Sequence, residues 1–95
     1  MSEPADFEWS SEKAVANAAK HRVTFDLAVL VFKDDRRLIL DTTREVDGEI
    51  RYKCIGRVAG RLLTVVYTKR QGCIRVISAR RANGKEERSY GDRSL

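Results

Sequence analysis

The chain has few of the residues on which metal sites, disulfide frameworks and membrane spans depend. Its 95 residues include two cysteines, Cys54 and Cys73, and one histidine, so they allow at most one disulfide and no structural zinc site. The longest apolar run, Leu27 to Phe32, is far shorter than the ~20 residues that span a bilayer. Residues 1–6 have neither the cationic start nor the apolar stretch of a signal peptide. We expect one cytoplasmic domain over residues 1–95, without metal, cofactor or membrane anchor.

Charge, in contrast, is plentiful and unevenly distributed. Nineteen Lys and Arg against fourteen Asp and Glu give a net charge of +5. Residues 1–48 carry seven basic and ten acidic side chains, whereas residues 49–95 carry twelve and four, so the halves have net charges of −3 and +8. A basic half on a small domain favours an anionic partner, nucleic acid above all. An ordinary solvated surface is the other interpretation of the same charges.

Periodicity predicts two short helices in the first half of the chain. Ser10 offers an N-cap, and a stripe of alanine and valine follows it, so we expect a helix over about residues 11–21. Thr24 can cap a second helix, whose apolar face runs through 25–32 at helical spacing. One or two helical turns are expected at 85–90.

Alternating and β-branched residues predict strands joined by short turns. Asp47-Gly48 is one turn signal, and short loops join the last three strands into an antiparallel meander. The predicted fold class is α+β, with two N-terminal helices packed on an antiparallel four- to five-stranded sheet and a short C-terminal helix. The expected strands lie at about residues 7–9, 37–42, 49–57, 61–69 and 73–80.

The register of the meander decides which basic side chains share a face. Symmetric three-residue loops would place Arg51 opposite Tyr67 and bring Arg57, Arg61 and Arg81 into one row. A two-residue loop at the last turn would instead shift the final strand and exchange its faces. Arginine on such a face suits phosphate, because the planar guanidinium donates two parallel hydrogen bonds.

His21 is the only histidine, and histidine is the side chain that exchanges protons near neutral pH. Beside Lys20 and Arg22 it can act as a general acid or base. A histidine at a helix C-terminus also serves as a cap for the last carbonyls. The sequence has no G-x-S-x-G, P-loop, G-x-G-x-x-G or H-E-x-x-H motif. The residues alone thus predict a small basic domain that binds an anionic polymer.

Four motifs follow one another along the chain: Trp9-x3-Lys13-x3-Asn17-x2-Lys20-His21-x-Val23-x-Phe25, Arg51-Tyr52-Lys53-Cys54-Ile55-Gly56-Arg57, Val65-Val66-Tyr67-Thr68, and Ile77-Ser78-Ala79-Arg80-Arg81-Ala82 followed by Glu86 and Tyr90. In this order they resemble the motifs of one family, the BrnT ribonuclease toxins of type II toxin–antitoxin pairs, whose fold is RelE-like. Arg22 departs from the pattern, because the family usually has glycine there.

The resemblance implies a toxin that cleaves mRNA without metal and thereby inhibits translation and growth. It implies a cognate BrnA-type ribbon-helix-helix antitoxin, which neutralises the toxin in a heterotetramer and contacts operator DNA when the complex represses its own operon. Two alternatives remain open. One is a catalytically weak or inactive homologue that acts as a co-repressor module, and the other is a stand-alone nucleic-acid-binding protein.

Metal-free RNA cleavage needs a base for the 2′-hydroxyl, cations for the charged phosphorane and an acid for the leaving 5′-oxygen. Arginine stays protonated and cannot be the base. With the resemblance, this assigns the phosphate and transition-state clamps to Arg51, Arg57 and Arg80. The proton-transfer candidates, in falling order, are His21, Glu49 and Tyr90. Further RNA contacts are expected from Lys20, Lys53, Tyr67, Arg75 and Arg81.

Overall fold

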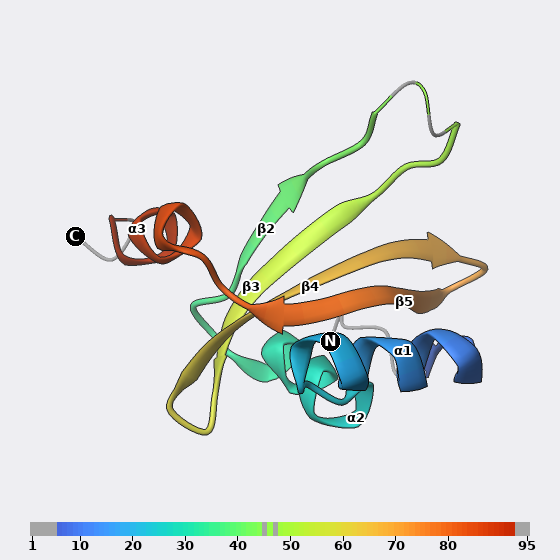
Figure 1. The fold of residues 1–95 in the computed structure, drawn as a ribbon. Helices are drawn as coiled ribbons and strands as arrows, with labels where there is room; N and C mark the ends of the chain where they lie inside the picture. The colour runs from blue at the N-terminus through green and yellow to red at the C-terminus, as the bar shows by residue number, and fades with distance from the viewer. Residues whose placement is uncertain (1–5, 45, 47, 93–95) are drawn as a thin grey trace.

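The computed structural model describes residues 6–44, 46 and 48–92 as a curved sheet flanked by helices (Figure 1). All the helices and strands predicted from the sequence are present within one or two residues of the expected positions, except at the second helix and at the start of the third strand. The elements, in chain order, are β1 (Phe7–Glu8), α1 (Ser11–His21), α2 (Phe25–Ala28), the 3-10 helix η1 (Val29–Lys33), β2 (Leu38–Asp41), β3 (Tyr52–Val58), β4 (Arg61–Arg70), β5 (Cys73–Arg81) and α3 (Gly84–Asp92).

The sheet is mixed, which corrects the antiparallel sheet predicted from the sequence. Its five strands lie in the order β1-β5-β4-β3-β2. The β2–β3, β3–β4 and β4–β5 pairs are antiparallel. The short β1 pairs parallel with β5, with Phe7 opposite Ile74. Alternation along a segment predicts a strand but not the direction of the strand with which it pairs. In the chain, α1 and α2 follow β1 and lie on one side of the sheet (Figure 1).

Both predicted N-caps are confirmed. The Ser10 and Thr24 hydroxyls accept hydrogen bonds from backbone N–H groups three residues later, at 3.4 and 3.3 Å. The second helix is shorter than predicted, because after Ala28 the chain tightens into η1. Its apolar face is nonetheless buried as expected, with Phe25, Ala28 and Phe32 in the core.

The β3–β4 and β4–β5 hairpins turn on two residues each, so the register with three-residue loops was wrong, whereas the alternative two-residue loop at the last turn is confirmed. Ala59-Gly60 and Gln71-Gly72 all have positive φ, between 46 and 83°, as two-residue hairpin turns require. Tyr67 consequently lies opposite Tyr52, not Arg51. The turn predicted at Asp47-Gly48 lies partly outside the described residues, since only Gly48 is described, with φ +62°.

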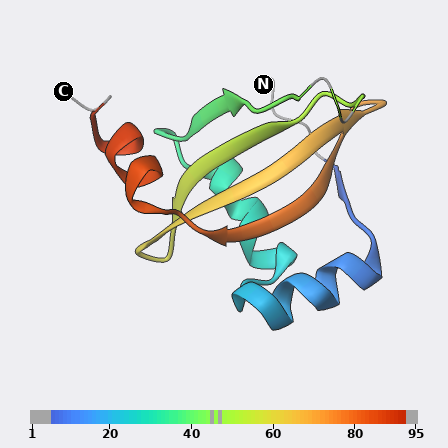
Figure 2. The same ribbon diagram turned by 45° about the horizontal axis from the view of Figure 1, so that its top comes forward.

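The core lies between the sheet and the layer formed by α1, α2 and η1 (Figure 2). Tyr67 is 1% exposed and packs edge-on against Phe32, with ring centroids 5.1 Å apart. Gly56 permits the close packing of η1 on β3, because a Cβ there would fall 2.8 Å from the Val31 carbonyl oxygen. Cys54 is buried and Cys73 is half-buried, and no disulfide joins the two.

In both views α3 lies at one end of the sheet, away from α1 and α2 (Figures 1 and 2).

Among the described residues, none of the helices has the length and apolar character needed to cross a membrane.

Candidate functional site: a basic pocket between the sheet end and α3

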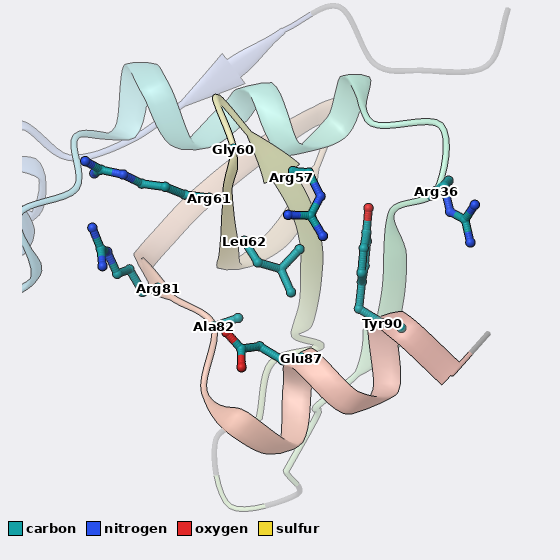
Figure 3. A pocket seen from close by; sticks show the side chains of 10 residues that line it. Arg36, Arg57, Gly60, Arg61, Leu62, Arg81, Ala82, Glu87 and Tyr90 are labelled. Atoms are coloured by element: carbon teal, nitrogen blue, oxygen red, sulfur yellow. The ribbon is translucent and has the colours of Figure 1, made fainter. Parts of the chain in front are cut away.

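An open pocket of about 760 Å³ lies between α3 and the end of the sheet where β3 turns into β4 (Figure 3). Four arginines line it, with Glu87 as the acidic lining side chain, so the pocket is strongly positive. Arg61 and Arg81 lie on one side of it, whereas Arg57 and Tyr90 face each other on the other (Figure 3). The lining residues are Arg36, Arg57, Gly60, Arg61, Leu62, Arg81, Ala82, Glu87, Tyr90 and Gly91.

The tight β3–β4 turn explains how arginines from opposite sheet faces meet in one pocket. Arg57 pairs with Leu62, whereas Arg61 pairs with Val58 at the turn itself. Because side chains alternate along a strand, Arg57 and Arg61 leave the sheet on opposite faces. The pocket wraps around the end of the sheet and therefore collects both, together with Arg81 from the last position of β5.

A hydrogen-bonded cluster of Asp34, Arg57 and Tyr90 borders the pocket. The Tyr90 hydroxyl donates to Asp34 Oδ2 at 2.6 Å, and the Arg57 backbone N–H donates to the same oxygen at 2.8 Å. The Arg57 guanidinium lies over the Tyr90 ring, 5.6 Å from its centroid. Burial, reinforced by Asp34, raises the pKa of Tyr90. Partial burial opposes ionisation of Asp34, but the hydrogen bonds it accepts prevail and lower its pKa.

A second polar cluster attaches α3 to the sheet through Glu86, which is 3% exposed. Arg80 donates two hydrogen bonds to the Glu86 carboxylate, at 2.8 and 2.9 Å, and Lys53 Nζ donates another at 2.8 Å. The Thr64 hydroxyl donates a further hydrogen bond to the carboxylate at 2.9 Å, so three adjacent strands each contribute one donor side chain. Asn83 and Glu86 also exchange side chain-to-backbone hydrogen bonds, which form a capping box at the start of α3.

This cluster holds Glu86 in its charged form. Burial raises the pKa of the carboxyl, but the hydrogen bonds from Arg80, Lys53, Asn83 and Thr64 outweigh it and bring the pKa far below its usual 4.5. The same contacts with Glu86 raise the pKa of Arg80.

Of the residues predicted to form the site, Arg57, Arg81 and Tyr90 come together in the pocket. Arg80 and Lys53 lie beside it, on Glu86. Arg51 and Glu49 lie near the other end of β3 and face each other at 3.6 Å. Arg57 lies six residues after Arg51 in an extended chain, which is about 20 Å at the rise of a strand.

The remaining predicted residues also lie apart from the pocket. Arg75 pairs with Glu8 across β5 and β1 at 3.2 Å. Tyr67 belongs to the core, where burial and the neighbouring Cys54 raise its pKa to about 12. Lys20 and His21 line a separate shallow groove between α1 and β5. No group of three or more His, Cys, Asp and Glu side chains suited to a metal ion occurs in the described part of the chain.

Sequence reasoning missed Arg36 and Asp34. No site role was predicted for their segment, although Asp-Asp-Arg-Arg is a turn signal. Aspartate at the first position of such a turn accepts the backbone N–H two residues later. That bond forms here between Asp34 Oδ1 and the Arg36 N–H, at 2.9 Å.

Residues 9–86 match the sequence profile of a family described as "ribonuclease toxin, BrnT, of type II toxin-antitoxin system". The chain belongs to the BrnT family. The match covers most of this BrnT chain, including Asp34, Arg57 and Arg81, and ends four residues before Tyr90. The comparison with curated proteins found no match.

Membership of the family makes the chain a ribonuclease toxin of a type II toxin–antitoxin system, with an antitoxin as its partner. Four arginines, from the η1–β2 turn, from β3 and β4 and from the end of β5, line the basic pocket of this BrnT chain. RNA is a polyanion, so the pocket is the candidate site at which the toxin meets its substrate.

Proposed function

We propose that this toxin is an endoribonuclease that cleaves mRNA in the cytoplasm without a metal ion, and that the basic pocket is its active site. The observation that carries the proposal is the convergence of Arg36, Arg57, Arg61 and Arg81 on one open pocket of a BrnT-family chain. The pentavalent phosphorane formed during RNA cleavage carries more negative charge than the substrate. Fixed guanidinium groups stabilise that extra charge without a metal.

Within the pocket we assign the phosphate clamp to Arg57, Arg61 and Arg81. Arg80 takes a supporting role, because both arms of its guanidinium bind Glu86 and it does not line the pocket. Of the three candidates for proton transfer, Tyr90 lines the pocket, whereas His21 and Glu49 lie outside it. The proposal therefore keeps Tyr90 in the active site, where its ring lies under the Arg57 guanidinium, and leaves the general base and the general acid unassigned.

The antitoxin, in this proposal, is a BrnA-type ribbon-helix-helix protein. It forms a heterotetramer with the toxin and supplies the DNA contacts with which the complex represses its own operon. Support comes from the type II toxin–antitoxin family of the chain. An antitoxin that neutralises the toxin must cover the basic pocket or change its shape.

Arg57→Ala tests the proposal. Expression of the wild-type chain alone should arrest growth and degrade mRNA, and the variant should abolish both effects, because removing one fixed donor at a developing charge costs about 10²–10³ in rate. Arg88→Ala is the matched control, since Arg88 is an exposed arginine of α3 that does not line the pocket. It should remain fully toxic.

Growth arrest, RNA integrity and soluble expression are measured together, and circular dichroism checks that Arg57→Ala folds. An unchanged toxicity of the folded variant would remove Arg57 from the clamp. If soluble wild-type protein leaves RNA intact yet binds its antitoxin tightly, the endonuclease proposal fails and the co-repressor alternative takes its place.

A further inference from the structure

Asp34 ends η1 in a conformation fixed by its own turn. Its backbone N–H donates to the Val31 carbonyl at 3.2 Å, and its carbonyl accepts the Arg37 N–H at 3.0 Å. Its Oδ1 accepts the Arg36 N–H at 2.9 Å. These local bonds fix the backbone and one carboxylate oxygen of Asp34, which leaves Oδ2 to point away from the turn.

Oδ2 makes the two long-range bonds. The first residue of β2, Leu38, lies opposite Ile55, so β2 does not extend far enough to pair with Arg57. The Arg57 N–H donates to Asp34 Oδ2 instead. The carboxylate thus takes the place of a missing strand partner. The Tyr90 hydroxyl donates to the same oxygen from α3, so one atom joins η1, β3 and α3.

The phenol also contacts the Arg57 guanidinium, which stacks over its ring. Because the Tyr90 hydroxyl donates its hydrogen bond to Asp34, the phenol oxygen can only accept hydrogen bonds on the side of the pocket. It is suited to orient a cation there, not to donate a proton to a leaving group. Asp34 therefore contacts Arg57 at its backbone and, through Tyr90, supports its side chain.

We propose that Asp34 is the positioning residue of the active site, which holds Arg57 directly and through Tyr90 so that its guanidinium faces the reacting phosphate. The catalytic consequence rests on the proposed endonuclease function, but the positioning itself does not. A small displacement of a catalytic group from its productive geometry costs rate out of proportion to its cost in stability.

Asp34→Asn is the test, because it keeps the shape of the side chain and removes its charge. The carboxylate accepts from Arg36 with one oxygen and from Arg57 and Tyr90 with the other, whereas the amide has only one acceptor oxygen and cannot accept all three hydrogen bonds in this arrangement. We expect kcat for RNA cleavage to fall about 10- to 100-fold. KM should stay near its wild-type value, because the other arginines still hold the substrate.

Two comparisons separate positioning from a general loss of structure. Asp35→Asn is the matched control, since Asp35 is the exposed neighbour of Asp34 and takes no part in the hydrogen bonds that Asp34 accepts from Arg36, Arg57 and Tyr90. It should leave kcat unchanged. Tyr90→Phe keeps the ring under Arg57 but breaks the link to Asp34, so the double variant Asp34→Asn/Tyr90→Phe should cleave no more slowly than the slower single variant.

A readout without RNA keeps the two proposals distinguishable. The Arg57 Nε–H signal in the NMR spectrum, assigned by its absence in Arg57→Ala, reports whether the guanidinium is held. It should be sharp in the wild type and in Asp35→Asn, and broadened in Asp34→Asn and Tyr90→Phe. If it stays sharp in both of the last two, Asp34 does not position Arg57, whatever the activity.

The kinetic measurements test the catalytic consequence of the positioning. Wild-type cleavage with an unchanged kcat in folded Asp34→Asn overturns the inference and leaves the endonuclease proposal intact. Additive losses in the double variant also overturn it, because they would give Tyr90 a role of its own in the reaction. If the wild type cleaves nothing but the NMR signal responds as expected, the endonuclease proposal fails while the positioning of Arg57 is established.

Discussion

Arg22 has a backbone conformation that glycine adopts at the least cost. It ends α1 with φ 58° and ψ 33°, and its N–H donates to the Ala18 carbonyl at 2.9 Å. This is the left-handed C-cap at which helices usually place glycine, because a Cβ there is strained by about 1–2 kcal/mol. The departure from the family pattern noticed in the sequence therefore coincides with measurable strain in the backbone.

Arg22→Gly should raise the free energy of unfolding by about 1 kcal/mol, since relief of strain exceeds the extra entropy that glycine gives the unfolded chain. Urea denaturation followed by circular dichroism measures the change. The control is Lys20→Gly, an exposed position inside α1, which should lower stability by about 0.5–1 kcal/mol. Equal losses in the two variants would mean that the Arg22 side chain makes a stabilising contact worth more than the strain.

At the scale of single elements, α3 is held to the sheet mainly by polar contacts. Its buried residues are Glu86 and Tyr90, and each bonds a side chain of another element. Removal of one partner from a buried ion pair costs about 3–5 kcal/mol, because the other charge is left uncompensated. A domain of this size has a total stability of roughly 5–14 kcal/mol. Much of the stability therefore depends on one carboxylate.

Glu86→Gln should lower the free energy of unfolding by about 3 kcal/mol. The amide cannot accept from Arg80, Lys53 and Thr64 with both oxygens, and its own N–H₂ group would face cations. Urea titration at neutral pH measures the loss. Glu87→Gln, at the exposed neighbouring position, should change stability by no more than about 0.5 kcal/mol.

The pH dependence supplies the second measurement on these variants. The pKa of Glu86 lies below its unfolded value of 4.5, so its contribution is complete above that pH and is lost as the pH falls toward the folded-state pKa. Wild-type stability should therefore decline from about pH 5 downward, and the decline should be shallower in Glu86→Gln. An equally steep decline in the variant would assign the acid sensitivity to other carboxylates, Asp34 first among them.

Prediction from the sequence succeeded for elements and for caps, because these depend on residues near one another in the chain. Ser10 and Thr24 act as expected, and the strands follow the alternation of apolar residues. The register with three-residue loops failed, and the choice at the last turn stayed open, because Ala59 and Gln71 adopt positive φ, which neither residue type signals. The parallel pairing of β1 with β5 was not predicted, because pairing over so long a separation leaves no local trace.

The candidate site was predicted only in part, because some of its contacts join residues far apart in the chain. Arg57 and Arg81 were found because arginine on a basic strand already suggests phosphate. Asp34 was not, since its importance arises from Arg57 and Tyr90, which lie 23 and 56 residues away in the chain. Only the folded chain brings them to one oxygen.

At the scale of the whole molecule, only part of the positive charge of the second half faces the pocket, and another part is already paired with carboxylates. Lys53 and Arg80 bind Glu86, and Arg75 binds Glu8. Arg57, Arg61 and Arg81 line the pocket with Arg36 from the acidic half. The net charge of the half therefore overstates the charge that RNA would meet at the site.

The salt dependence of RNA binding measures that difference. For single strands, log K falls with log salt at about −0.7 per phosphate neutralised, so four pocket arginines give a slope of about −3. A 2′-deoxy strand, which lacks the nucleophilic hydroxyl, allows binding to be measured by fluorescence anisotropy without cleavage. Arg61→Ala should make the slope shallower by about 0.7, whereas Arg88→Ala should leave it unchanged. A wild-type slope of about −6 or steeper would mean that RNA runs along the whole basic half, and the pocket would then be one contact among several instead of the principal binding site.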